Sequence, residues 1–139
     1  MAGYSGTPLI KKLGIKDNFD VAFVNPPANF VTQLDLPATV NLKRNSQSKA
    51  LDFIQVFVKS RVALTTAFAQ YPAKLKSNGM FWISWPKKSS GVQTDLNENI
   101  VRDIGLAAGL VDVKVCAIDD VWSGLKFVYR LRDRPKLRP

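Results

Sequence analysis

The segment Gly79–Arg130 reads GMFWISWPKKSSGVQTDLNENIVRDIGLAAGLVDVKVCAIDDVWSGLKFVYR and decides the fold. It opens with an apolar strand, Met80–Pro86, which is followed by the basic loop KKSSG. Asp95 and Glu98 then predict a capping box at the start of a helix, whose apolar residues recur at helical spacing until Gly109. Two alternating runs, VDVKVCAI and GLKFVYRL, are joined by a short connection and predict an antiparallel hairpin.

The first half of the chain carries two further strong strand patterns. Asp20–Asn25 is an apolar run that ends at two prolines, and Leu51–Val58 is followed by Ser60 as a helix N-cap. Weaker patterns predict short helices at 8–14 and 28–34, a strand at 38–43 and a turn at 77–79. This strand–helix repetition predicts a three-layer α/β fold with a Rossmann-like, mostly parallel sheet of about six strands and a C-terminal antiparallel hairpin.

Size and composition favour one domain. The chain has 139 residues, and we expect a single α/β domain over residues 1–131 with a basic tail at 132–139. No apolar run approaches the ~20 residues of a membrane span. The start lacks the apolar core of a secretory signal, and Cys116 is the sole cysteine, so no internal disulfide can form. Together these features predict a cytoplasmic protein that does not contact a membrane.

The chain contains no histidine. This absence excludes Ser-His-Asp and Cys-His nucleophiles, as well as histidine-ligated zinc and iron sites. Glu98 is the sole glutamate, so paired carboxylates would have to include aspartates. Cys116 lies in an apolar strand and is interpreted as a small buried hydrophobe. Asp119 and Asp120 are interpreted as turn formers, and we predict neither a metal site nor a bound cofactor.

The net charge of +9 reflects twenty basic and eleven acidic residues. A charge of this size attracts polyanions but does not identify a partner. Basic residues gather in the tail RLRDRPKLRP, and Lys11, Lys12 and Lys16 lie near the other end. We interpret most of this charge as a solvated surface.

The order of elements from Leu51 to Leu131 resembles that of class I S-adenosylmethionine-dependent methyltransferases. Nearly the whole chain also resembles a bacterial family of domain-of-unknown-function proteins, through MAGYSGTPLIKKLGIK, SWPKKSSG, TDLNENIVRD and GLVDVKVCAIDDVWSGLKFVYR. Both resemblances imply a methyltransferase-like, Rossmann-like fold. The second carries no activity with it.

The methyltransferase motifs depart from the family pattern at two positions. After its first strand the family has a glycine-rich turn, whereas this chain has Asn25–Asn29, which lacks glycine and contains two prolines. After its second strand the family has an acidic residue for the ribose, whereas this chain has Lys43 and Arg44. Asn25-Pro26-Pro27-Ala28 is similar to the Asn-Pro-Pro-aromatic motif of amino-methyltransferases, but it follows the first strand and lacks the aromatic residue. We interpret it as a rigid turn.

Ligands of open α/β sheets bind at the carboxyl ends of the strands. The loop after Met80–Pro86 offers two cations and two hydroxyls before a helix N-terminus, which favours an anion. The predicted anion site comprises Lys87, Lys88, Ser89, Ser90, Gly91, Asn25 and Arg61.

Three functions remain open from the sequence. We expect a small non-catalytic α/β module that binds an anionic small molecule or a macromolecule. One alternative is a divergent S-adenosylmethionine-dependent methyltransferase. Another is non-specific nucleic-acid binding through the basic loop and the tail.

Overall fold

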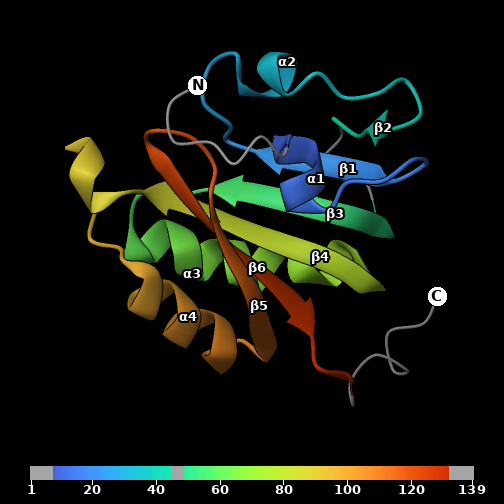
Figure 1. Ribbon diagram of the computed structural model, residues 1–139. Coiled ribbons are helices and arrows are strands. Elements are labelled where there is room, and N and C mark those ends of the chain that lie inside the picture. The colour runs from blue at the N-terminus through green and yellow to red at the C-terminus, as the bar shows by residue number, and fades with distance from the viewer. Residues whose placement is uncertain (1–7, 45–48, 132–139) are drawn as a thin grey trace.

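The computed structural model describes residues 8–44 and 49–131 (Figure 1). The predicted basic tail 132–139 lies outside the described residues. The elements follow the chain in the order α1 (Leu9–Leu13), β1 (Asp20–Val24), α2 (Phe30–Leu34), β2 (Asn41–Leu42), β3 (Leu51–Phe57), α3 (Arg61–Gln70), η1 (Pro72–Lys74), β4 (Leu75–Pro86), η2 (Lys88–Ser90), α4 (Glu98–Ala107), β5 (Leu110–Ala117) and β6 (Trp122–Tyr129).

Within the described ranges the strands form one six-stranded sheet in the order β2-β1-β3-β4-β6-β5. β1 pairs in parallel with β2 and β3, and β3 pairs in parallel with β4. β6 runs antiparallel to both β4 and β5. This confirms the predicted mostly parallel, Rossmann-like sheet with a C-terminal hairpin. The antiparallel strand β6 lies one position inside the edge of the sheet, because it pairs with β4 and leaves β5 outermost.

Helices cover both faces of the sheet (Figure 1). One face packs against α3 and α4, whose Leu64, Phe68 and Val101 are buried among strand residues. The other face packs against α1 and α2 through Leu13 and Phe30. Helices lie on both sides because both faces of a parallel sheet are apolar and must be shielded from water.

Trp82 and Trp85 show how strand periodicity separates these layers. Their odd spacing in one strand predicts opposite faces, and the structure confirms it. Trp82 is fully buried on the α1 side, where its indole N–H donates to the Leu13 carbonyl oxygen at 3.0 Å. Trp85 is buried on the α3 and α4 side.

Two element boundaries differ from the prediction. β2 is limited to Asn41–Leu42, shorter than the expected strand. The expected turn at 77–79 is an irregularity inside β4: Leu51 pairs with Leu75, but Phe53 pairs with Met80. A Cβ at Gly79 would lie 2.9 Å from a carbonyl oxygen of β3, so the irregularity requires glycine there.

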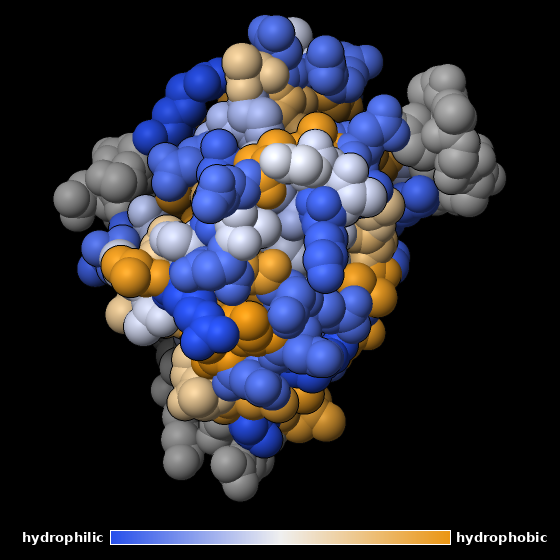
Figure 2. Space-filling view, turned by 90° about the vertical axis from the view of Figure 1, so that its left-hand side faces the viewer, coloured by the Kyte–Doolittle hydropathy of each residue, from blue (hydrophilic) through white to orange (hydrophobic). Residues whose placement is uncertain are grey.

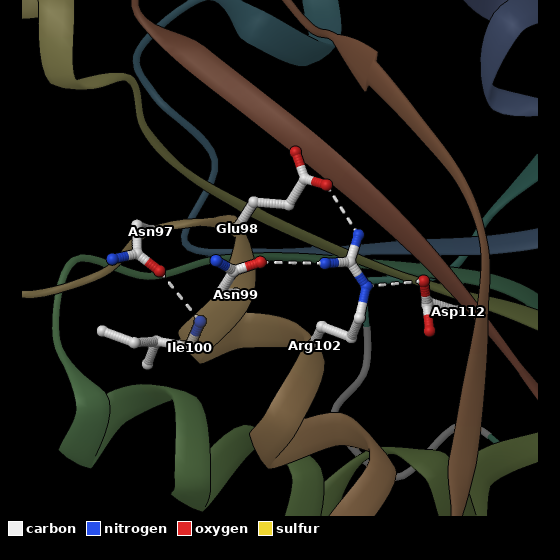
Figure 3. A network of polar contacts seen from close by, with 6 residues as sticks. All are labelled: Asn97, Glu98, Asn99, Ile100, Arg102 and Asp112. Atoms are coloured by element: carbon white, nitrogen blue, oxygen red, sulfur yellow. Dashed lines mark hydrogen bonds and ion pairs between the residues drawn. The ribbon is translucent and has the colours of Figure 1, made fainter.

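The predicted capping box at Asp95 and Glu98 is wrong. Asn97 is the N-cap of α4, and its Oδ1 accepts a hydrogen bond from the Ile100 N–H at 2.9 Å (Figure 3). The helix therefore begins later than the pattern predicts, which leaves the Asp95 side chain available for a contact outside α4.

Arg102 joins α4 to the edge of the sheet (Figure 3). Its Nη2 donates to Glu98 Oε2 at 2.6 Å and its Nη1 to Asn99 Oδ1 at 3.2 Å, both within α4. Its Nε donates to Asp112 Oδ2 on β5 at 2.9 Å. The hydrogen bonds to Asp112 and Glu98 raise the pKa of the guanidinium, which stays charged throughout the physiological range.

Candidate functional site

The carboxyl ends of β3 and β4 point to one side of the molecule, which Figure 2 shows face on. From β1 the chain passes outward to β2 and then returns across β1 to β3. This reversal places the topological switch point between β1 and β3, where open α/β sheets bind their ligands. The side seen in Figure 2 is mainly hydrophilic, with small hydrophobic patches between polar residues.

A crevice of about 460 Å³ opens at this switch point, and we call it the switch-point crevice. Phe57 and Trp122 line it, with ring centroids 5.1 Å apart and an interplanar angle of 85°. Asn25 after β1 and the segment Lys59–Ser60 after β3 add polar groups. An apolar wall with a few polar groups is the usual composition of a small-molecule site.

The turn after β1 has left-handed backbone geometry without glycine. Asn25 has a φ of 55° and Asn29 a φ of 68°. Asparagine tolerates this region better than most residues because its short side chain bonds locally. The chain therefore bends after β1 through left-handed asparagines in place of glycine, and Pro26 and Pro27 remove two backbone donors.

A second pocket, also of about 460 Å³, lies between the end of β4 and the start of α4, and we call it the loop pocket. Lys87 and Lys88 line it together with the carboxylates Asp95 and Glu98. Ser123 from β6 completes the polar lining. The loop pocket thus carries both signs of charge, which suits a ligand that has a proton to lose as well as an anionic group.

The segment between η2 and α4 is tied to the start of α3. Asp95 Oδ1 accepts a hydrogen bond from the Arg61 N–H at 2.9 Å, and the Thr94 hydroxyl donates to the Lys59 carbonyl oxygen at 2.6 Å. Ser60 is the N-cap of α3, as predicted, and accepts from the Ala63 N–H. These bonds hold the switch-point crevice and the loop pocket next to each other.

The predicted anion site is divided between the two pockets. Asn25 lines the switch-point crevice, whereas Lys87 and Lys88 line the loop pocket. Arg61 is exposed at the start of α3, between them, and the carboxylate of Asp95 already occupies its backbone N–H. Anion binding by this set stays a prediction.

The remaining members of that set shape the loop. The Ser90 hydroxyl donates to the Lys87 carbonyl oxygen at 2.7 Å and accepts from the Val92 N–H at 3.1 Å. Gly91 has a φ of 76°, and Ser89 is exposed. The Ser90 hydroxyl therefore supports the turn and contacts no other element through these bonds.

Phe57 and Trp122 were not predicted as site residues. The one available signal for Phe57 was its place at the carboxyl end of a strong strand. For Trp122 there was none, because local patterns do not reveal that β6 returns to pair with β4. Trp122 is buried, and its ring packs edge-on against Phe57.

Asp119 forms the hairpin turn, as interpreted from the sequence. Its Oδ1 accepts from the N–H groups of Val121 and Trp122, both at 2.8 Å.

Cys116 is half-buried. This burial raises the pKa of its thiol, and the charges of Lys114 and Lys12 lower it by a smaller amount. Residues 8–44 and 49–131 contain no cluster of histidine, cysteine and carboxylate side chains that could hold a metal ion. None of the helices described is long and apolar enough to cross a membrane.

Comparison with known proteins identifies the fold. No protein-family model and no curated protein matches the chain, so the resemblance to a bacterial family of unknown function stays a prediction. Among solved structures, the chain is similar to the ribosomal protein L11 methylase from Lactobacillus delbrueckii subsp. bulgaricus, with a TM-score of 0.55 and 12% identity over 88% of this chain and 75% of that one. It is also similar to a TehB-like SAM-dependent methyltransferase from Corynebacterium glutamicum, with a TM-score of 0.56 and 8% identity over 88% and 85% of the two chains.

A third similar structure is the fibrillarin of Aeropyrum pernix, solved with natively bound S-adenosyl-L-methionine. It has a TM-score of 0.54 and 11% identity over 91% of this chain and 70% of that one. The chain therefore has the Rossmann-like fold of class I S-adenosylmethionine-dependent methyltransferases. At these identities the likeness concerns the fold alone.

Proposed function

We propose that this chain is a divergent S-adenosylmethionine-dependent methyltransferase that binds its cofactor in the switch-point crevice. The observation that carries the proposal is the crevice at the carboxyl ends of β1 and β3, in a fold shared with such enzymes. Two features of the crevice fit the cofactor. The left-handed turn at Asn25 gives the sharp bend that the family forms with glycine, and Phe57 and Trp122 offer an apolar wall to an adenine ring.

The two neighbouring pockets support separate roles for cofactor and substrate. S-adenosylmethionine supplies an activated methyl group when bound. The Asn25 amide, the Ser60 hydroxyl and the Lys59 ammonium are polar side-chain groups of the crevice that can hold its polar end. In the loop pocket, Asp95 can accept the proton that a substrate nitrogen or oxygen loses on methylation, because Glu98 is already paired with Arg102. Lys87 and Lys88 can hold an anionic substrate.

A second candidate function is a non-catalytic module that binds an anionic, nucleotide-like ligand at the same edge. The observation that favours it is charge. Lys43 and Arg44 follow β2 where the methyltransferase family has an acidic residue, and they line a pocket that shares Asn25 with the crevice; Lys59 lines the crevice itself. S-adenosylmethionine carries a net positive charge, so these cations favour a phosphorylated ligand over it.

Isothermal titration calorimetry with S-adenosylmethionine and S-adenosylhomocysteine tests the first proposal. We expect both to bind with micromolar affinity. Trp122→Leu should weaken binding because it removes the flat wall, and Asn25→Gly should do so while keeping the left-handed turn. The control Lys76→Ala lies outside both pockets and should bind as the unmodified protein does. Circular dichroism melting separates loss of the site from loss of the fold.

The same titrations decide between the two candidates. If neither S-adenosylmethionine nor S-adenosylhomocysteine shows a heat of binding, whereas adenosine triphosphate does, the methyltransferase proposal is wrong and the anion-binding module is supported. If S-adenosylhomocysteine binds and adenosine triphosphate does not, the basic residues after β2 do not select the ligand. A methyl-transfer assay with labelled S-adenosylmethionine is informative once binding is established.

A further inference from the structure

Four lysines gather on the face of the sheet that carries α1, away from both pockets. Lys12 lies in α1 and Lys16 just after it, Lys114 lies on β5, and Lys126 lies on β6. We call this set the lysine face. None of the four lines the switch-point crevice or the loop pocket, and none was predicted to belong to a site.

Contacts between the elements bring these lysines together. Lys114 and Lys126 are direct partners in the register of β5 and β6. The Lys114 ammonium also donates to the Lys12 carbonyl oxygen near the end of α1 at 2.8 Å. Lys126 is half-buried, and its pKa is lowered first by this burial and then by the charges of Lys114 and Lys16.

None of the ion pairs found within residues 8–44 and 49–131 involves these four lysines. Those ion pairs join Lys43 with Asp20, Lys76 with Asp52, and Arg102 with Glu98 and Asp112. Like charges directly opposite in an antiparallel pair destabilise the sheet. The cross-strand pair Lys114–Lys126 therefore has an unfavourable arrangement that a bound anion would relieve.

We propose that the lysine face binds the phosphate backbone of a nucleic acid. The four cations come from three separate segments of the chain, so an extended polyanion matches them better than a small anion does. The overall charge of +9 would steer such a partner toward the protein. This inference concerns a surface separate from the proposed cofactor site and does not depend on methyl transfer.

Fluorescence anisotropy with a labelled duplex of about 20 base pairs, titrated at several salt concentrations, tests the proposal. For each phosphate contact that a lysine makes, its replacement by glutamine should reduce the slope of log K against log salt by about 0.9. We expect this change for Lys16→Gln, Lys114→Gln and Lys126→Gln. Lys16 is exposed, so its variant should keep the fold even if Lys114→Gln loosens the end of α1.

Two charge-matched controls identify the surface. Lys76→Gln removes a cation that is paired with Asp52 at 3.1 Å, and Lys88→Gln removes one in the loop pocket. Both should leave the salt slope unchanged. The proposal is overturned if Lys88→Gln lowers the slope and the lysine-face variants do not, because the contact then lies in the basic loop.

Two further results would also overturn the proposal. One is the absence of binding to the duplex and to the matching single-stranded RNA at low salt. The other is competition by poly-glutamate as strong as that by unlabelled duplex, because the face would then bind any polyanion. Neither result bears on cofactor binding in the switch-point crevice, which calorimetry measures separately.

Discussion

Gly105→Ala places a methyl group where α4 lies directly on the sheet. A Cβ at Gly105 would lie 2.2 Å from Cε2 and 2.6 Å from Cζ of the Phe127 ring on β6. Phe127 is fully buried, and the Phe68 ring packs against it at right angles with centroids 5.1 Å apart. The ring therefore has little room to withdraw, and α4 or β6 must shift.

Two opposing effects determine the magnitude. Overpacking of a tight core costs up to about 3 kcal/mol, whereas replacing glycine by alanine inside a helix stabilises it by about 1 kcal/mol. We expect Gly105→Ala to lower the free energy of unfolding by about 2 kcal/mol. In a domain of this size that lowers the melting temperature by roughly 6–10 °C.

Urea unfolding followed by circular dichroism, combined with a double-mutant cycle, is the assay. Phe127→Leu removes the two ring atoms nearest to the new methyl group. The double variant should therefore be more stable than the sum of the single effects predicts, by about 0.5–3 kcal/mol. If Gly105→Ala is as stable as the unmodified protein, or more so, helix propensity dominates and the close packing of α4 on β6 is refuted.

Two further predictions concern the N-cap of α4 and the thiol of Cys116. Asn97→Ala removes the acceptor of the Ile100 N–H and should therefore lower the free energy of unfolding by about 1 kcal/mol, measured by urea titration. If Asn99→Ala lowers the free energy of unfolding by the same amount, the capping role of Asn97 is contradicted. Burial raises the pKa of the Cys116 thiol, so less thiolate is present at pH 8 and iodoacetamide should react with it more slowly than with glutathione. Lys114→Gln should slow that reaction further because the lysine lowers the thiol pKa, and an unchanged rate would contradict their proximity.

The sequence by itself determined the elements and the faces that they bury. Apolar periodicity predicted the strands β1, β3 and β4 and the closing hairpin, because a residue's burial on a regular element follows from its spacing alone. Trp82 and Trp85 fell on opposite faces for this reason. The order of strands and helices predicted a mostly parallel sheet, because parallel neighbours require crossovers.

Only the tertiary structure decided which side chains meet. Asp95 has the spacing of a cap for α4, yet it bonds the start of α3, because that helix end lies beside it after folding. Trp122 faces Phe57 and Lys114 faces Lys126 because β6 pairs between β4 and β5. Strand order and register arise from long-range pairing that local spacing does not encode, and they determine the crevice, the loop pocket and the lysine face.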